Sequence, residues 1–152
     1  MEINVRTAWT LLKVNPPLFA RKAYNKLLVE TSQFIGRPRG RCLKRCHGVT
    51  FECPVDADVT IREMWFGAYE LEVADLVRRL LKPGDVFIDV GANIGYYSFL
   101  AACRVGRQGQ VHAFEPVPQY FQQLSNLAAL NPGYRFIFNA CALGEQQGIA
   151  TV

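Results

Sequence analysis

A short apolar segment that ends in a glycine-bearing turn constrains the fold of this chain more than any other feature. Residues 85–95 read Asp-Val-Phe-Ile-Asp-Val-Gly-Ala-Asn-Ile-Gly, and the apolar stretch over residues 94–105 has helical spacing. A second apolar run, residues 110–115, ends on Glu115. A strand, a tight turn, a helix and a second strand ending on a carboxylate are typical of a parallel sheet that binds a nucleotide.

The second half of the chain continues this alternation of strands and helices. Apolar residues after Glu115 keep helical spacing as far as Leu130, and Asn131-Pro-Gly133 ends the helix. Residues 134–139 then read as a third strand. Together these elements predict an α/β fold: a right-handed βαβαβ unit, half of a doubly wound sheet, with strand order 3-2-1.

Two helices are expected before the first strand. One runs from Gly67 to Leu81 and is closed by Lys82-Pro-Gly84. The other opens at Pro17. Its apolar side holds Leu18, Ala20, Ala23, Tyr24, Leu27 and Leu28. We expect this helix to pack on its own domain, with docking on a membrane surface as the alternative.

Between these helices the sequence is first basic and then alternating. Residues 36–47 are rich in Gly, Pro and Arg, which predicts a basic loop. Val49, Phe51 and Cys53 alternate with other residues as in an edge strand, and residues 59–61 are a candidate for its hairpin partner.

The charge is distributed unevenly between the two parts of the chain. Residues 1–50 hold ten Lys or Arg against two acids, giving +8, whereas residues 51–152 hold seven against eleven, giving −4. A basic segment suits nucleic acid, anionic lipid or an acidic partner, and charge alone selects none of them. We expect a basic extension of helix, loop and hairpin at residues 1–60 and a Rossmann-like domain at residues 61–152.

Composition favours a cytoplasmic protein without a metal site. No run approaches the roughly 18 apolar residues of a membrane span, and the first residues lack the layout of a secretory signal. Five cysteines are an odd number, which favours free thiols in a reducing compartment. Cys42, Cys46, His47 and Cys53 suggest zinc, but their C-x3-C spacing has no second pair, so we expect no metal.

The glycine turn suits a ligand with anionic groups. Gly91 and Gly95 let the backbone approach a ligand closely, and the amides that open the next helix offer donors and a positive dipole end. A dinucleotide fingerprint would read G-x-G-x-x-G, whereas this chain has Asn93 in place of the middle glycine. A nicotinamide-dependent oxidoreductase fragment is therefore the alternative interpretation.

Four strings resemble the FkbM-type S-adenosylmethionine-dependent methyltransferases, which have a class I Rossmann-like fold. The strings are Phe66-Gly-Ala-Tyr-Glu70, Pro83-Gly-Asp-Val-Phe-Ile-Asp-Val-Gly-Ala-Asn-Ile-Gly-Tyr-Tyr-Ser98, Val111-His-Ala-Phe-Glu-Pro-Val-Pro118 and Ala140-Cys-Ala-Leu-Gly144. The resemblance covers about residues 60–152 and is specific in combination. It implies S-adenosylmethionine as cofactor and methyl transfer, most often to an oxygen of a small-molecule or glycan-type acceptor.

The resemblance also implies roles for individual residues. Glu115 would accept hydrogen bonds from both ribose hydroxyls, and Asp89 with the turn after it would hold the methionine part of the cofactor. The remaining cofactor-binding candidates are Gly91, Ala92, Asn93 and Gly95 in the turn, Pro116 and Val117 beside the adenine, Ala142 and Leu143 closing the adenine slot, and Tyr69 and Glu70 approaching the amino-acid end from the preceding helix. No catalytic residue is identified.

The three carboxylates also have purely structural interpretations. Asp89 could cap the amides of the turn, Glu115 the following helix, and Glu70 could compensate the dipole of the first turn of its helix.

A third class of function, a non-enzymatic interaction module that uses the basic residues 37–45, also stays open. Nucleic acid is a poor candidate for its partner because the basic residues have no interleaved aromatic residues for base stacking.

The family pattern continues into a fourth parallel strand, whereas this sequence stops at residues 148–152. We therefore expect the cofactor-binding half of a methyltransferase, as a fragment or a truncated gene product, in which cofactor binding is a safer expectation than turnover. Without a fourth strand, residues 87–90 would form an unpaired apolar edge through which the chain can self-associate.

Overall fold

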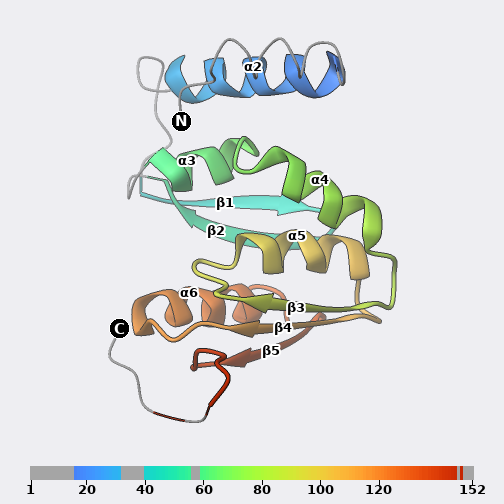
Figure 1. Ribbon diagram of the computed structural model, residues 1–152, viewed down its shortest axis with the longest axis vertical. Helices are drawn as coiled ribbons and strands as arrows, with labels where there is room; N and C mark the ends of the chain where they lie inside the picture. Colours follow the sequence, from blue (N-terminus) through green and yellow to red (C-terminus); the bar gives the residue numbers. More distant parts are fainter. Residues whose placement is uncertain (1–15, 32–39, 56–58, 147, 149–152) are drawn as a thin grey trace.

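The computed structural model describes residues 16–31, 40–55, 59–146 and 148 (Figure 1). The part of the predicted basic loop at residues 36–39 lies outside this set. Along the chain the elements are α2 (Pro16–Thr31), β1 (Arg41–Cys46), β2 (Val49–Pro54), α3 (Val59–Phe66), α4 (Leu71–Leu80), β3 (Val86–Val90), α5 (Tyr96–Val105), β4 (Gln110–Phe114), α6 (Pro118–Ala129) and β5 (Arg135–Asn139). Among the described residues no helix is long and apolar enough to cross a membrane.

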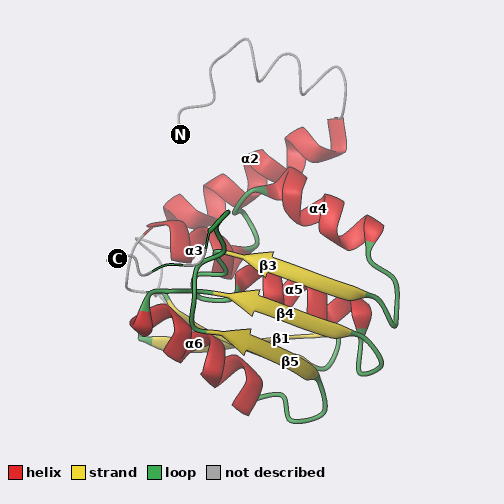
Figure 2. Ribbon diagram, turned by 60° about the horizontal axis from the view of Figure 1, so that its bottom comes forward, coloured by secondary structure: helices red, strands yellow, loops and turns green. Residues whose placement is uncertain are grey.

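Strands β3, β4 and β5 form a parallel sheet with β4 in the centre (Figure 2). Helix α5 connects β3 to β4, and α6 connects β4 to β5. The order β3-β4-β5 is the predicted 3-2-1 order read from the other edge, so the βαβαβ unit is confirmed. The carboxyl ends of the three strands therefore meet at one edge of the sheet.

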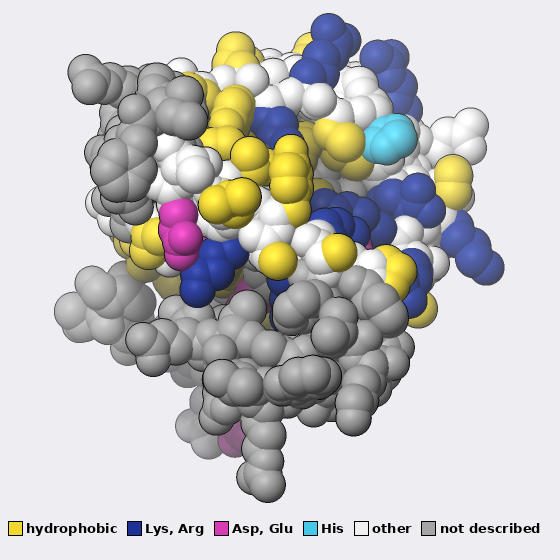
Figure 3. Space-filling model, turned by 90° about the horizontal axis from the view of Figure 1, so that it is seen from above, with side chains coloured by type: hydrophobic (Ala, Val, Ile, Leu, Met, Phe, Trp, Pro, Cys, Tyr) yellow, Lys and Arg dark blue, Asp and Glu magenta, His cyan; other side chains and the backbone are white. Residues whose placement is uncertain are grey.

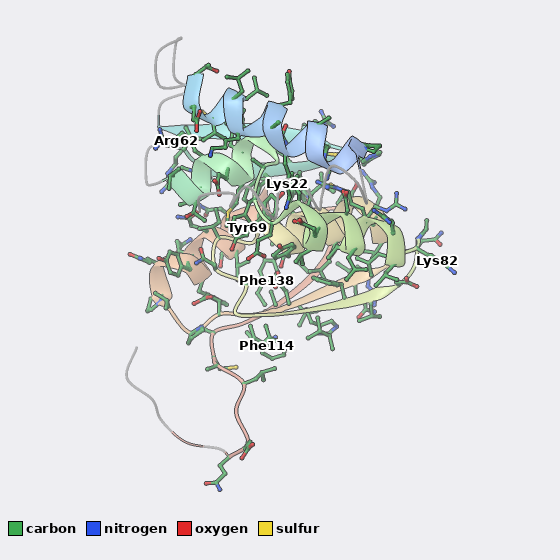
Figure 4. The ribbon with its side chains drawn as sticks, turned by 45° about the horizontal axis from the view of Figure 1, so that its top comes forward. Lys22, Arg62, Tyr69, Lys82, Phe114 and Phe138 are labelled. Atoms are coloured by element: carbon green, nitrogen blue, oxygen red, sulfur yellow. The ribbon has the colours of Figure 1, made fainter. Side chains whose placement is uncertain are left out.

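Helices α5 and α6 cover the same face of this sheet (Figure 1). Figure 4 shows Phe138 on the helix side and Phe114 on the opposite side. In β3 the side chains that point away from the helices, Val86, Ile88 and Val90, are 56%, 60% and 60% exposed. No described helix or strand covers this second face (Figure 1).

A two-stranded antiparallel hairpin, β1–β2, packs on the other side of α5 (Figure 1). Val49, Phe51 and Cys53 are buried, and the Phe51 ring stacks on Phe99 of α5 with centroids 5.0 Å apart. This confirms the predicted strand over these residues. Helix α5 is thus enclosed between two sheets and is the best buried helix of the described chain.

Two segments next to strand β2 differ from the prediction. Residues 41–46, predicted as a loop, form strand β1, because pairing with β2 satisfies their backbone and every second side chain turns toward the core. His47 and Gly48 form the tight turn, with φ angles of 47° and 85°. Residues 59–61, the candidate hairpin partner, instead begin α3, which buries Ile61 and Met64 at helical spacing.

Helix α2 packs through the side opposite to the one predicted. Tyr24 and Leu27 are 61% and 57% exposed, whereas Asn25 and Val29 are buried. Polar contacts decide this orientation: the Asn25 amide donates to the Gly67 carbonyl (3.1 Å). Ion pairs join Arg21 to Asp75 (2.8 Å) and Lys22 to Glu72 of α4, and Figure 4 shows Lys22 between the two helices.

Two other predicted helices begin later than their apolar spacing indicated. Helix α4 starts at Leu71 rather than Gly67, because Gly67 and Glu70 have left-handed φ angles of 69° and 38°. Helix α5 starts at Tyr96 rather than Ile94, after a left-handed Gly95.

The five cysteines are free thiols. In the described part of the chain, no group of three or more His, Cys, Asp or Glu is arranged to hold a metal ion.

Candidate functional site

The turn after β3 is fixed to the end of the neighbouring strand by its backbone. The amides of Gly91 and Ala92 both donate to the Phe114 carbonyl, at 2.9 and 3.1 Å. The Gly95 amide donates back to the Ala92 carbonyl (2.8 Å), and the Gly95 carbonyl accepts from the Phe99 amide to open α5. The strand, the turn and the helix therefore form one rigid unit at the carboxyl edge of the sheet.

The two glycines of the turn serve different purposes. A Cβ at Gly95 would lie 2.8 Å from Leu124 Cδ2 of α6, and the φ of 84° already disfavours any side chain. At Gly91, whose φ is 73°, a Cβ would meet no atom within 4 Å. Gly95 is thus needed for packing, whereas Gly91 leaves open space beside the backbone, where a ligand can approach.

Asn93 takes the middle position of the turn, where the dinucleotide fingerprint has a glycine. Its φ of 51° is left-handed, a conformation that Asn tolerates better than most residues. The Asn93 side-chain oxygen accepts from the Ile94 amide (2.7 Å), which stabilises the turn locally.

The Glu115 carboxylate lies at the end of β4 and faces this turn. Only 4% of the residue is exposed. One carboxylate oxygen accepts from the Asn93 amide (2.8 Å), and the other accepts from the Val117 amide (2.9 Å). Each carboxylate oxygen has two lone-pair sites, so Glu115 can accept two further hydrogen bonds. The bond to Val117 fixes the residue before α6, whereas α6 itself has no side-chain cap hydrogen bond, so Glu115 does not cap this helix.

Asp89 lies within β3 and is 8% exposed. Its carboxylate accepts from the Ser98 hydroxyl (2.7 Å) in α5, and not from the turn amides that its structural interpretation requires. Burial raises the pKa of Asp89, and the charge of Glu115 adds to this rise while the Ser98 hydrogen bonds oppose it. Two acidic groups therefore share one buried corner of the sheet, which favours a cation beside them.

Tyr69 and Glu70 lie in the turn before α4, not on a helix as predicted. The Tyr97 hydroxyl of α5 donates to the Glu70 carboxylate (2.6 Å), and the Tyr69 ring lies 5.7 Å from the Tyr96 ring and 6.3 Å from the Tyr97 ring. Burial and the Glu70 carboxylate raise the pKa values of Tyr69 and Tyr97. Glu70 is thus tied to the start of α5, through a residue two positions after Gly95.

The other predicted site residues lie along the same edge of the sheet. Pro116 and Val117 are half-buried and directly follow Glu115. Ala142 and Leu143 are exposed and follow β5. The carbonyl of Asn139, the last residue of β5, accepts a hydrogen bond from the Glu115 amide (3.0 Å). The structure joins the turn to Glu115 by a direct hydrogen bond through Asn93, and it ties Asp89 to α5 through Ser98, whereas Ala142 and Leu143 share only the strand end with them.

Three residues of this arrangement had no predicted role: Tyr97, Ser98 and Asn139. Tyr97 and Ser98 belong to the string at residues 83–98, so a helical reading of its last turn could have identified them. Asn139 is a polar residue at the end of an apolar strand, where its amide donates to the Ala113 carbonyl (3.2 Å). No signal in a single sequence pairs it with Glu115.

Comparison with known proteins agrees with this geometry. Residues 89–151 match the family described as Methyltransferase FkbM domain. The 31-O-demethyl-FK506 methyltransferase FkbM of Streptomyces tacrolimicus is 39% identical over 70 residues, which are 45% of this chain and 26% of that protein. The chain therefore spans about a quarter of the length of this curated relative.

Among solved structures, M. jannaschii TYW2 in complex with AdoMet has a TM-score of 0.50 at 18% identity, covering 68% of this chain and 44% of that chain. At this identity the likeness concerns the fold, and it confirms the predicted class I methyltransferase architecture. The family match over residues 89–151 and the curated relative confirm the resemblance expected from the sequence.

Proposed function

We propose that this chain binds S-adenosylmethionine and is the cofactor-binding part of a methyltransferase. The observation that carries the proposal is the buried Glu115 carboxylate, which is held against the turn at the carboxyl edge of a parallel sheet with spare acceptor capacity. Ligands of such sheets bind at this edge. The family match over residues 89–151 supports a methyltransferase in particular.

The charge of the residues at this edge and the open space beside Gly91 support the proposal. Glu115 would accept the two ribose hydroxyls with the lone pairs that its backbone bonds leave. Asp89 would provide negative charge for the cationic methionine part, and the open backbone at Gly91 would admit it. The other residues proposed to contact the cofactor are Ala92, Asn93 and Gly95, Pro116 and Val117, Ala142 and Leu143, and Tyr69 and Glu70.

When bound, the cofactor supplies a methyl group on a positively charged sulfur, open to in-line displacement by a nucleophile. The protein's contribution at this edge is positional and electrostatic. The turn, held rigid by its own hydrogen bonds, would position the ligand by its shape, and Asp89 and Glu115 would provide carboxylates around a cation. Glu70, held by Tyr97, would add a third carboxylate at the amino-acid end.

We further propose that the acceptor is an oxygen of a small molecule or glycan. Support comes from the curated relative, whose name describes a methyltransferase for 31-O-demethyl-FK506, a compound that lacks a methyl group on an oxygen. A cytoplasmic location is proposed with it, because an S-adenosylmethionine-dependent reaction needs the cofactor pool. No residue is assigned here as a catalytic base.

The test is a pair of calorimetric titrations of the 152-residue chain, one with S-adenosylhomocysteine and one with NADH. We expect micromolar affinity for S-adenosylhomocysteine and no measurable binding of NADH. Binding of NADH alone would contradict the proposal in favour of the oxidoreductase alternative.

A further inference from the structure

A second candidate site lies on the far side of α5 from the sheet. A pocket opens between the β1–β2 hairpin, α4 and α5. Its lining residues are Lys44, Cys46, His47, Arg78, Tyr96, Phe99, Leu100, Cys103 and Arg104. None of these belongs to the proposed cofactor contacts, so the pocket requires an explanation of its own.

Three elements bring positive charge to this pocket: β1 contributes Lys44, α4 contributes Arg78 and α5 contributes Arg104. Figure 3 shows Lys and Arg side chains gathered near a histidine on the face seen from above. Within the described residues only Arg78 of the three pairs with a carboxylate, that of Asp75 (3.2 Å). Asp75 is shared with Arg21 (2.8 Å), so the local charge stays positive.

Lys44 is a donor on the β1 side of the pocket. Its ammonium donates to the Trp65 carbonyl (2.6 Å). Burial lowers the pKa of Lys44 and Arg78 lowers it further, whereas Cys46, Cys53 and Cys103 oppose this shift. A bound anion would also oppose the shift and favour the ammonium form.

Tyr96 is a further polar residue of the pocket lining. It is 3% exposed. Burial raises its pKa, and Arg78 opposes this rise through its charge and a side-chain hydrogen bond. The Tyr96 hydroxyl therefore lies beside the Arg78 guanidinium, and an anion that Arg78 binds would lie close to it.

The Cys103 thiol of the pocket does not indicate a metal or redox site. Cys103 donates its thiol to the Cys46 carbonyl (3.2 Å). Burial raises the pKa of Cys103, so the thiol stays protonated at neutral pH. A protonated thiol is neither a metal ligand nor a nucleophile, and it adds no negative charge to the pocket.

We propose that this pocket binds the phosphate group of a small phosphomonoester. Guanidinium, ammonium and hydroxyl donors from three directions match a dianion with several acceptor oxygens better than they match a single carboxylate. Phe99 and Leu100 form an apolar wall, which would pack against the organic part of the ligand. The inference does not depend on the proposed methyltransferase function.

The test uses phenyl phosphate and the matched ligand phenol, which lacks the phosphate, in calorimetric titrations of the 152-residue chain at constant ionic strength. Phenyl phosphate is expected to bind at least tenfold more tightly than phenol. R104Q is expected to weaken phenyl phosphate binding about tenfold, because it removes a charged donor from the pocket. Y96F removes only the hydroxyl and is expected to weaken binding severalfold without changing the fold.

The matched control is R79Q, which removes the same charge from an exposed residue of α4 that does not line the pocket. R79Q should bind phenyl phosphate like the wild type. Equal losses in R104Q and R79Q would show a response to net charge and overturn the proposal, as would equal affinities for phenol and phenyl phosphate. Affinity for S-adenosylhomocysteine should be the same in R104Q as in the wild type, which separates this site from the proposed cofactor site.

Discussion

At the scale of single residues, the site depends on two buried carboxylates with different surroundings. Glu115 has a backbone amide on each oxygen, whereas Asp89 has the Ser98 hydroxyl. Hydrogen bonds to a carboxylate favour its ionised form, and burial opposes ionisation. For Asp89 burial prevails and raises the pKa, so its charge is sensitive to any change in its donors.

This sensitivity predicts a pH dependence of cofactor binding. The ionised form of Asp89 attracts the ammonium group of S-adenosylhomocysteine, so affinity should fall as the pH decreases through the raised pKa of Asp89. Replacing the donor in the variant S98A should raise this pKa further, so the loss of affinity should occur at higher pH than in the wild type. Calorimetric titrations over a pH series would measure the midpoint.

The control for S98A is S125A, because the Ser125 hydroxyl donates to the Phe121 carbonyl within α6 and contacts neither carboxylate. S125A should leave the midpoint unchanged. A midpoint in S98A that equals the wild-type value, or lies below it, would exclude Asp89 as the titrating group.

At the scale of elements, the N-terminal hairpin belongs to the same core as the helix that opens the site. The core that includes Phe51 and Cys53 of β2 continues through Phe99 and Ala102 of α5 to Leu127 of α6. Because α5 begins directly at Gly95, packing of the hairpin on α5 also supports the turn. The predicted division of the chain at residue 60 remains a prediction about domains.

We expect the variant F51A to destabilise the whole chain. Phe51 is 1% exposed and stacks on Phe99, so truncation removes buried apolar surface and leaves a cavity, at a cost of about 3–5 kcal/mol in the free energy of unfolding. L43A, on the exposed side of the same hairpin, should cost less than about 0.5 kcal/mol. Urea unfolding measures both, and similar values for the two variants would refute the packing role of the hairpin.

The second half of the fold could be predicted from the sequence because local patterns determine it. Strand β3, its turn and α5 follow from apolar runs and from Gly91 and Gly95. Strand β1 was missed because its pairing with β2 outweighs a composition of Arg and Lys, which is a tertiary effect. The buried side of α2 was wrong for a similar reason, since ion pairs from Arg21 and Lys22 to α4 cannot be read from the periodicity of α2.

The site was predictable in part for the same reason. Asp89 lies within one apolar strand and Glu115 directly follows the next one, and a parallel sheet brings these two positions together. The partners that fix them, Ser98 and Asn139, are polar residues whose contacts depend on how helices and strands pack. Single-sequence patterns contain no information on such pairs.

At the scale of the whole molecule, the described structure has one face that its own elements leave open. Val86, Ile88 and Val90 of the edge strand β3 are each more than half exposed, and Ile137 of β5 on the same face is 37% exposed. An open apolar face beside an unpaired strand edge favours association. The proposed partner is a second copy of this chain.

We predict that the purified chain forms dimers or larger species at micromolar concentration and that I88K shifts it toward the monomer. A charge on this face would have to be buried on association, at a cost in free energy that the dimer cannot offset. L27K is the matched control, because Leu27 is similarly exposed on α2, on another surface. Sedimentation equilibrium would decide: a monomeric wild type, or equal effects of I88K and L27K, would contradict association through β3.

The most direct test of the central claim is the affinity of E115Q for S-adenosylhomocysteine, measured by calorimetry beside an unfolding curve. Gln keeps the shape of Glu115 but loses its charge and one pair of acceptor sites, so the folded variant should bind about tenfold or more weakly. E30Q, an exposed change on α2, should bind like the wild type. Folded E115Q with wild-type affinity would contradict the account, because the cofactor would then not be held by Glu115.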